Sequence, residues 1–121
     1  MKLAYCLGQR TTERTQKLHL MYSSLGFEHS YIWLDCHQDL VEALQLARPD
    51  LIVVYATETN QSTSDLETFL LANAPETAPI IVYSTNDKSL YQLNKNRRLL
   101  ALNENWNELE IKAYMLIKAS L

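Results

Sequence analysis

The chain has 121 residues, of which 47% are hydrophobic and 21% charged, and its formal net charge is -3. These are ordinary values for one soluble globular domain, and the negative balance argues against a domain that binds nucleic acid through its overall charge, since such domains are normally basic. With two glycines in the whole chain, neither a dinucleotide-binding loop nor a Walker phosphate loop can be assembled, because both need several glycines at fixed spacing.

The first quarter of the chain predicts a strand, a helix and a second strand. Leu3–Leu7 is a short apolar run typical of a strand. Apolar residues recur at helical spacing from Thr12 onward, and Gly26 is the residue type that most readily closes a helix at its C-terminus. Ser30–Leu34 is rich in strand-forming residues. We therefore expect a β-α-β unit in this region.

A second helix and a fully apolar strand follow. Asp35 or Asp39 is a candidate cap for the helix, and Pro49 is expected to end it. The apolar face of this helix consists of Leu40, Val41, Leu44 and Ala47. Leu51–Tyr55 is apolar without interruption, as expected of a strand that a parallel sheet buries on both faces.

The pattern repeats in the second half. Ser64, with Glu67 three residues later, has the spacing of a capping box and predicts a third helix. Ile80–Tyr83 is another uninterrupted apolar strand. A short helix is expected near Leu90–Leu93 and a fifth strand over Leu99–Leu102. Alternation of this kind demands parallel strands joined by helices on both faces of the sheet.

The last helix is expected to start at Asn105 or Asn107 and to run to the end of the chain. It is apolar over more than one stripe, which is typical of a helix that is deeply buried or part of an interface. The basic run Lys95–Arg98 before the fifth strand is interpreted as a solvated loop rather than a nucleic-acid contact. We expect one domain over residues 1–121, with an N-terminal place in a longer regulator as one possible setting.

The middle of the chain resembles the receiver domains of bacterial response regulators. A helix leads through the step Pro49-Asp50 into an apolar strand, and Asp65–Leu70 has the pattern Asp-Leu-Glu-x-Phe-Leu. Pro79–Ser84 is a Pro-Ile-Ile-Val strand that ends in a hydroxyl residue, and Leu25–Phe27 is similar to the Leu-Gly-Tyr that ends the first receiver helix. Signatures of this kind support a fold better than a function. We predict a flavodoxin-like (βα)5 three-layer α/β sandwich whose five parallel strands lie in the order 2-1-3-4-5.

The resemblance also implies where receiver chemistry would lie. Receivers hold Mg²⁺ with an acidic pair, accept the phosphoryl group on an Asp, and bind its oxygens with a hydroxyl and a lysine. Ser84 retains the hydroxyl. The other four groups are missing from their positions: Leu7 and Gly8 for the acidic pair, Tyr55 (or at the latest Ala56) for the acceptor, and Asn103 for the lysine. A ring from Tyr55 or Tyr83 is expected to fill the former acidic pocket.

This loss makes the chain similar to a pseudo-receiver. We predict a cytoplasmic, non-enzymatic signalling module that works without phosphorylation, in signal transduction or transcription regulation. Its expected partners are other proteins or a second copy of the chain, with no cofactor and no membrane contact. No apolar run reaches the ~20 residues that a membrane-spanning helix needs, and the N-terminal apolar stretch is too short for a signal peptide.

Receivers often dimerise through the fourth helix, the fifth strand and the fifth helix, and aromatic residues are typical interface anchors. The resemblance therefore implies an interface on that surface. Its candidate residues are Tyr91, Ile111, Tyr114, Met115 and Lys118. The alternative is that Ile111 and Tyr114 only cover the edge of the core.

The sequence also bears on a small-ligand site and on a metal site. The Gly8–Thr15 loop is rich in hydroxyls and opens a helix, so a small flavin- or phosphate-ligand-binding protein of flavodoxin-like fold is the alternative function. No metal site is predicted, because the candidate ligands His19, His29, Cys36 and His37 lack metal-binding spacing. Cys6 lies in an apolar run and is expected to be a buried small hydrophobe.

Overall fold

The computed structural model describes residues 2–27, 29–35, 37–56, 63–75, 77–84, 99–103 and 105. Its strands are β1 (Ala4–Leu7), β2 (Tyr31–Leu34), β3 (Leu51–Tyr55), β4 (Ile80–Ser84) and β5 (Leu99–Asn103). The helices within these ranges are α1 (Thr12–Tyr22), α2 (His37–Leu46) and α3 (Thr63–Asn73), and a 3-10 turn η1 (Ser23–Leu25) follows α1. None of these helices is long and apolar enough to cross a bilayer.

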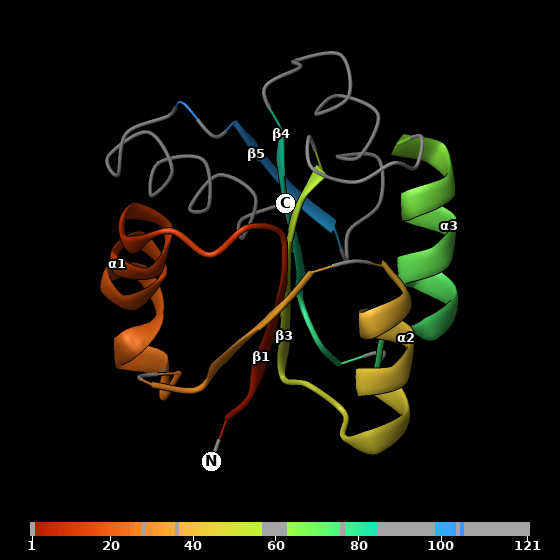
Figure 1. Ribbon diagram of the computed structural model, residues 1–121, viewed down its shortest axis with the longest axis horizontal. Helices are drawn as coiled ribbons and strands as arrows, with labels where there is room; N and C mark the ends of the chain where they lie inside the picture. The colour runs from red at the N-terminus through yellow and green to blue at the C-terminus, as the bar shows by residue number, and fades with distance from the viewer. Residues whose placement is uncertain are drawn as a thin grey trace.

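The five strands form one sheet in the order β2-β1-β3-β4-β5, and every neighbouring pair is parallel. Figure 1 shows α1 against one face of this sheet and α2 and α3 against the other. The predicted flavodoxin-like α/β fold and its strand order are therefore confirmed. The carboxyl ends of all five strands meet at one edge of the sheet, which is where parallel α/β sheets place their binding sites.

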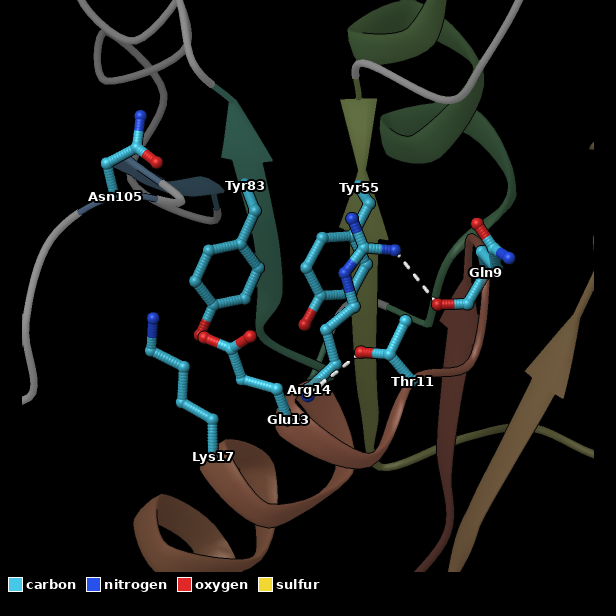
Figure 2. Close-up of a pocket in the computed structure, with 8 residues that line it drawn as sticks. All are labelled: Gln9, Thr11, Glu13, Arg14, Lys17, Tyr55, Tyr83 and Asn105. Carbon is cyan, nitrogen blue, oxygen red and sulfur yellow. Dashed lines mark hydrogen bonds between the residues drawn. The ribbon is translucent and has the colours of Figure 1, made fainter.

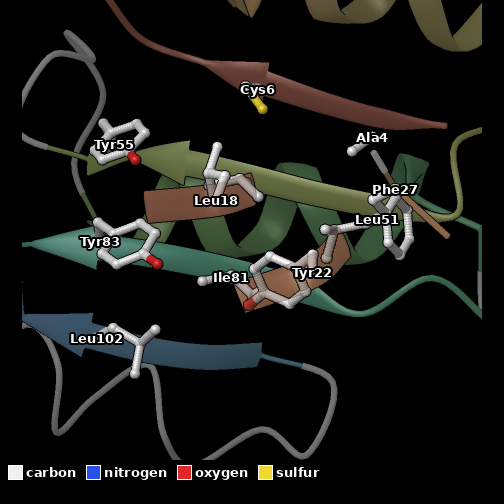
Figure 3. Close-up of a cluster of buried hydrophobic side chains, with 11 residues drawn as sticks. Ala4, Cys6, Leu18, Tyr22, Phe27, Leu51, Tyr55, Ile81, Tyr83 and Leu102 are labelled. Atoms are coloured by element: carbon white, nitrogen blue, oxygen red, sulfur yellow. The ribbon is translucent and has the colours of Figure 1, made fainter. Parts of the chain in front are cut away.

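The sheet separates two hydrophobic cores, one on each of its faces. The aliphatic core lies under α2 and α3 and consists of Tyr5, Leu7, Leu40, Ile52, Val54, Leu70, Ala74, Ile80 and Val82. The aromatic core lies under α1 and consists of Ala4, Cys6, Leu18, Tyr22, Phe27, Leu51, Val53, Tyr55, Ile81, Tyr83 and Leu102 (Figure 3). Because successive strand residues point to opposite faces, each central strand contributes alternately to both cores.

The start and end of α1 follow from local chemistry. Thr11 is the N-cap, with extended backbone, and its side-chain oxygen accepts a hydrogen bond from the backbone N–H of Arg14 at 3.1 Å. A cap of this kind contributes about 1 kcal/mol. The helix ends at Tyr22, η1 continues it, and Gly26 then adopts a left-handed φ of 90°. The predicted role of Gly26 as the residue that closes this segment is confirmed.

Some predicted boundaries and caps were wrong. Asp39 lies within the first turn of α2, so it is not that helix's cap; Ala47 follows the last helical residue, Leu46, and is exposed. Helix α3 begins at Thr63, so Ser64 is already helical. Strands β4 and β5 each run one residue beyond the apolar runs Ile80–Tyr83 and Leu99–Leu102, because Ser84 pairs with Asn103 in their ladder.

Several predictions concern residues outside the described part of the chain. They are the short helix over Leu90–Leu93, the basic run Lys95–Arg98 and the body of the last helix. The same holds for the complete candidate interface: Tyr91, Ile111, Tyr114, Met115 and Lys118.

Candidate functional site

Gly8 is the first residue after β1, at the carboxyl edge of the sheet. It is buried, and its N–H donates to the carbonyl of Leu34 at 3.2 Å. The β1–β3 register pairs Leu7 with Val54, so Gly8 follows beside Tyr55. Gly8 has a φ of 146°, which residues with a side chain rarely adopt. The backbone itself therefore disfavours a carboxylate where a receiver would carry one of its acidic pair.

Three aromatic rings stack along this edge and form what we call the aromatic row: Trp33, Tyr55 and Tyr83. The ring centroids of Trp33 and Tyr55 are 6.0 Å apart with planes 18° from parallel. Those of Tyr55 and Tyr83 are 5.0 Å apart with planes 11° from parallel. Both tyrosines are almost fully buried, with 2% and 1% of their surface exposed. The position expected for a phosphate acceptor thus holds a packed ring.

Arg14 lies over the aromatic row. The carbon at the centre of its guanidinium is 3.8 Å from the centroid of the Tyr55 ring, a cation–π contact that contributes about 0.5–2 kcal/mol. Its Nη1 donates to the carbonyl of Gln9 at 2.9 Å, while its backbone N–H is bound by Thr11. The side chain of Arg14 therefore connects the first turn of α1 to the row and to the loop before the helix, while its backbone N–H belongs to the N-cap.

A pocket of about 360 Å³ opens between the first two turns of α1 and the two tyrosines of the row (Figure 2). Its described lining residues are Gln9, Thr11, Glu13, Arg14, Lys17, Tyr55, Tyr83 and Asn105. Arg14 and Lys17 bring two positive charges, and Glu13 is the only carboxylate in this set. The volume falls in the range of small-molecule sites, ~300–1,000 Å³.

The other predicted positions lie beside this pocket but not in it. Leu7 belongs to the aliphatic core, and Ala56 packs against that core. Ser84 is 3% exposed, and alternation along β4 turns its side chain to the face opposite Tyr83. The retained hydroxyl of Ser84 and the aromatic row therefore lie on opposite faces of the sheet.

Asn103, at the expected lysine position, lies next to Ser84 in the β4–β5 register. Its side-chain oxygen accepts a hydrogen bond from the backbone N–H of Asn105 at 2.8 Å. This local turn brings Asn105 to the rim of the pocket. An amide at position 103 thus shapes the chain, where a lysine would have supplied a charge.

Some residues of the site had no predicted role. The Gly8–Thr15 loop was a candidate from the sequence, but Glu13 and Lys17 in the pocket and Trp33 in the aromatic row were not singled out. The spacing Glu13–Lys17 is i, i+4 and places both on one helix face, so it was a usable signal. The approach of Trp33 to Tyr55 was not, because β1 lies between their strands.

Cys6 is fully buried, as predicted. Burial raises the pKa of its thiol to about 12, so the thiol stays protonated at neutral pH and is a poor nucleophile. The rings of His19 and His29 are 5.9 Å apart, while Cys36 is outside the described residues. Within the ranges that the structure describes, no three His, Cys, Asp or Glu side chains gather as a metal site would need.

Two tyrosines on the α1 face of the sheet, Tyr31 and Tyr22, have raised pKa values. Burial raises the pKa of Tyr31 to about 12, and its hydroxyl donates to the carbonyl of Leu18 at 2.9 Å. Burial also raises the pKa of Tyr22, with smaller repulsive contributions from Tyr83 and two other tyrosines. These two phenols are therefore unsuited to act as bases at neutral pH.

No family model, curated protein or solved structure matches this chain. Function has to be argued from the carboxyl edge of the sheet itself.

Proposed function

We propose that this chain is a receiver-like signalling module that is not phosphorylated and acts by binding protein partners, including a second copy of itself. The observation that carries the proposal is the aromatic row with Arg14 over it. These groups occupy the edge at which a receiver would bind magnesium and phosphate. Under this proposal the chain has a receiver-like fold without the groups that carry out phosphorylation.

Acyl-phosphate formation needs a carboxylate nucleophile and a metal that neutralises the crowded negative charge. Tyr55 supplies neither the nucleophile nor a metal ligand, and Gly8 has no side chain. Glu13 is the one carboxylate among the described pocket residues, and Arg14 and Lys17 share the pocket with it. A single carboxylate beside two cations is a poor magnesium site, because Mg²⁺ binds through oxygen ligands and is repelled by positive charge.

The absence of phosphorylation is tested with acetyl phosphate and Mg²⁺, followed by intact mass. We expect the mass to stay unchanged, while a phosphorylatable receiver treated in parallel gains about 80 Da, the mass of one phosphoryl group. A species heavier by that amount in this chain would overturn the proposal.

Self-association is proposed through the helix that the sequence predicts after Asn105 or Asn107, which contains Tyr114. Light scattering coupled to size exclusion, on the wild type and on Tyr114→Asp, measures the oligomeric state. We expect a dimer for the wild type and a monomer for the variant, because a charge at an apolar interface is costly to desolvate. Self-association is wrong if both proteins are monomers.

The pocket supports a second candidate function, the binding of a small ligand through the Gly8–Thr15 loop and the turn that follows it. Thr11 and Arg14 come from that loop and line the pocket. A bound flavin would make the purified protein yellow and would shift the fluorescence of added flavin mononucleotide. A colourless protein that leaves that fluorescence unchanged excludes flavin.

A further inference from the structure

We propose that the pocket between α1 and the aromatic row binds a small zwitterion, an α-amino acid or a close analogue. The carboxylate of the ligand would face Arg14 and its ammonium group would face Glu13. The proposal deepens the second candidate function, ligand binding, on which it rests, and it is independent of whether the chain is phosphorylated.

The charges that line the pocket favour a ligand of both signs. Arg14 and Lys17 are positive and Glu13 is negative. A phosphate dianion would meet the repulsion of Glu13, and a simple cation would meet that of the two basic residues. A molecule that carries a carboxylate and an ammonium group offers an opposite charge to the basic residues and to Glu13.

Arg14 is held in place for a carboxylate. Its Nη1 is bonded to the Gln9 carbonyl and its guanidinium is stacked on Tyr55 at 3.8 Å. A planar guanidinium binds carboxylates through two parallel hydrogen bonds. Because two contacts already fix this side chain, a ligand would have less rotational freedom to remove when it binds.

Figure 2 shows Arg14 in front of Tyr55, and Glu13 and Lys17 on the Tyr83 side of the pocket. Glu13 and Lys17 are one helical turn apart on α1 and present opposite charges from the same face. The buried rings of Tyr55 and Tyr83 form the wall behind these groups. An ammonium group near such a wall gains from the negative face of the rings as well as from Glu13.

Binding is tested by thermal unfolding and calorimetry on the full chain, with each of the twenty L-amino acids as probes. Acetate, methylamine, inorganic phosphate and flavin mononucleotide at the same concentration serve as single-charge and rival probes. We expect at least one amino acid to raise the unfolding temperature and to titrate to one site per chain. Acetate and methylamine, each with half of the charge pattern, should leave the unfolding temperature unchanged.

Two pairs of variants locate the site. Glu13→Gln and Arg14→Gln should each weaken amino-acid binding about tenfold or more, the loss of one charge-assisted contact. The controls are Glu42→Gln on α2 and Arg48→Gln just after that helix, two exposed residues that do not line this pocket. Both controls should bind like the wild type, and unfolding curves confirm that all four variants are folded.

Three results would overturn the proposal that the pocket binds a zwitterion. Preferential binding of phosphate, strengthened by Glu13→Gln, would mean a simple anion site. Binding of flavin mononucleotide without any amino acid would mean a flavin site; in both cases ligand binding remains as a function. Failure of every probe to bind would remove the zwitterion and ligand binding together, and would leave the receiver-like module untouched.

Discussion

The two faces of the sheet are packed with different chemistry. The buried core under α2 and α3 is aliphatic apart from Tyr5, whereas the described part of the face under α1 carries six aromatic rings, four of them buried, a thiol and the wall of the pocket. Tyr5 is the one tyrosine in the described core of the face under α2 and α3, and its hydroxyl lies within hydrogen-bond distance of the carbonyls of Ala43 and Ala47. On the aromatic face several tyrosine hydroxyls are buried, and one of them has no hydrogen-bond partner among the described residues.

Three tyrosines of the aromatic face illustrate this difference. Tyr31 donates to the Leu18 carbonyl at 2.9 Å, and the Tyr83 hydroxyl is 3.8 Å from the sulfur of Met21, a weak acceptor. The Tyr22 hydroxyl is buried and has no hydrogen-bond partner in the described part of the chain. The face that carries the candidate site is thus the less completely satisfied of the two, as is common where function constrains packing.

The largest expected effect belongs to the aliphatic face. Leu40→Ala should lower the free energy of unfolding by about 2–5 kcal/mol, because it leaves a cavity in a fully buried site. Leu46→Ala on the same helix should change it by less than about 0.5 kcal/mol, since Leu46 is 88% exposed. Urea unfolding measures both. Equal losses would mean that α2 does not pack as described.

Alkaline pH should act on the aromatic face. The folded-state pKa of Cys6 is raised from 9.0 to about 12, and that of Tyr31 from 10.0 to about 12, in both cases mainly by burial. As the pH rises, both groups ionise in the unfolded chain before they ionise in the folded one. Their contribution to the free energy of unfolding is therefore fully present below pH 9 and is lost as the pH rises toward 12. The fully buried Cys6 thiol contributes up to about 1.4 kcal/mol per pH unit, and the partly buried Tyr31 contributes less because solvent screens its charge.

Cys6→Ala tests the source of this pH dependence, with the free energy of unfolding measured from pH 7 to 11. The variant should show a shallower fall between pH 9 and 11 than the wild type, because one buried ionisation is gone. Identical slopes would show that the Cys6 thiol is accessible to solvent in the folded state.

Tyr22 and Tyr31 should respond to loss of the hydroxyl with opposite signs. Tyr22→Phe removes a buried hydroxyl without a partner and should raise the free energy of unfolding by about 1 kcal/mol. Tyr31→Phe removes a hydrogen bond, leaves the Leu18 carbonyl with one partner fewer, and should lower it by about 1 kcal/mol. Urea unfolding of both variants checks the signs; a loss of stability in Tyr22→Phe would contradict this description of the core.

The smallest expected effect concerns the contact of Arg14 with the aromatic row. Arg14→Gln should lower the free energy of unfolding by about 0.5–1 kcal/mol, the value of a cation–π contact at a partly exposed site. Arg10→Gln, at an exposed residue of the same loop, should leave it unchanged. If both variants are as stable as the wild type, the guanidinium does not hold α1 to the row.

Much of the fold could be predicted from the sequence, because continuous apolar runs such as Leu51–Tyr55 are typical of strands buried on both faces. Exact helix ends were harder: Ala47 fits the periodicity of α2 but follows its last residue. Local patterns do not reveal which turn of a helix is the last when tertiary contacts decide it.

The site was predictable only in its outline. The sequence placed Gly8 and Tyr55 at the carboxyl edge, since the positions where strands end follow from the alternation of elements. The row itself depends on Trp33, two strands away from Tyr55, reaching across β1. Cys6, which pairs with Trp33 in the register, and Gly8 are small enough to leave room there. Contacts between strands that are not neighbours depend on side-chain volumes, which spacing alone does not encode.

A magnesium titration followed by amide NMR asks whether the carboxyl edge of the sheet still binds a divalent cation. We predict that the amides of Leu7, Gly8 and Tyr55 keep their chemical shifts at millimolar Mg²⁺, as do those of the aliphatic face. Saturable shifts confined to these three residues would mean that the edge keeps a working metal site and that the aromatic row has not replaced it.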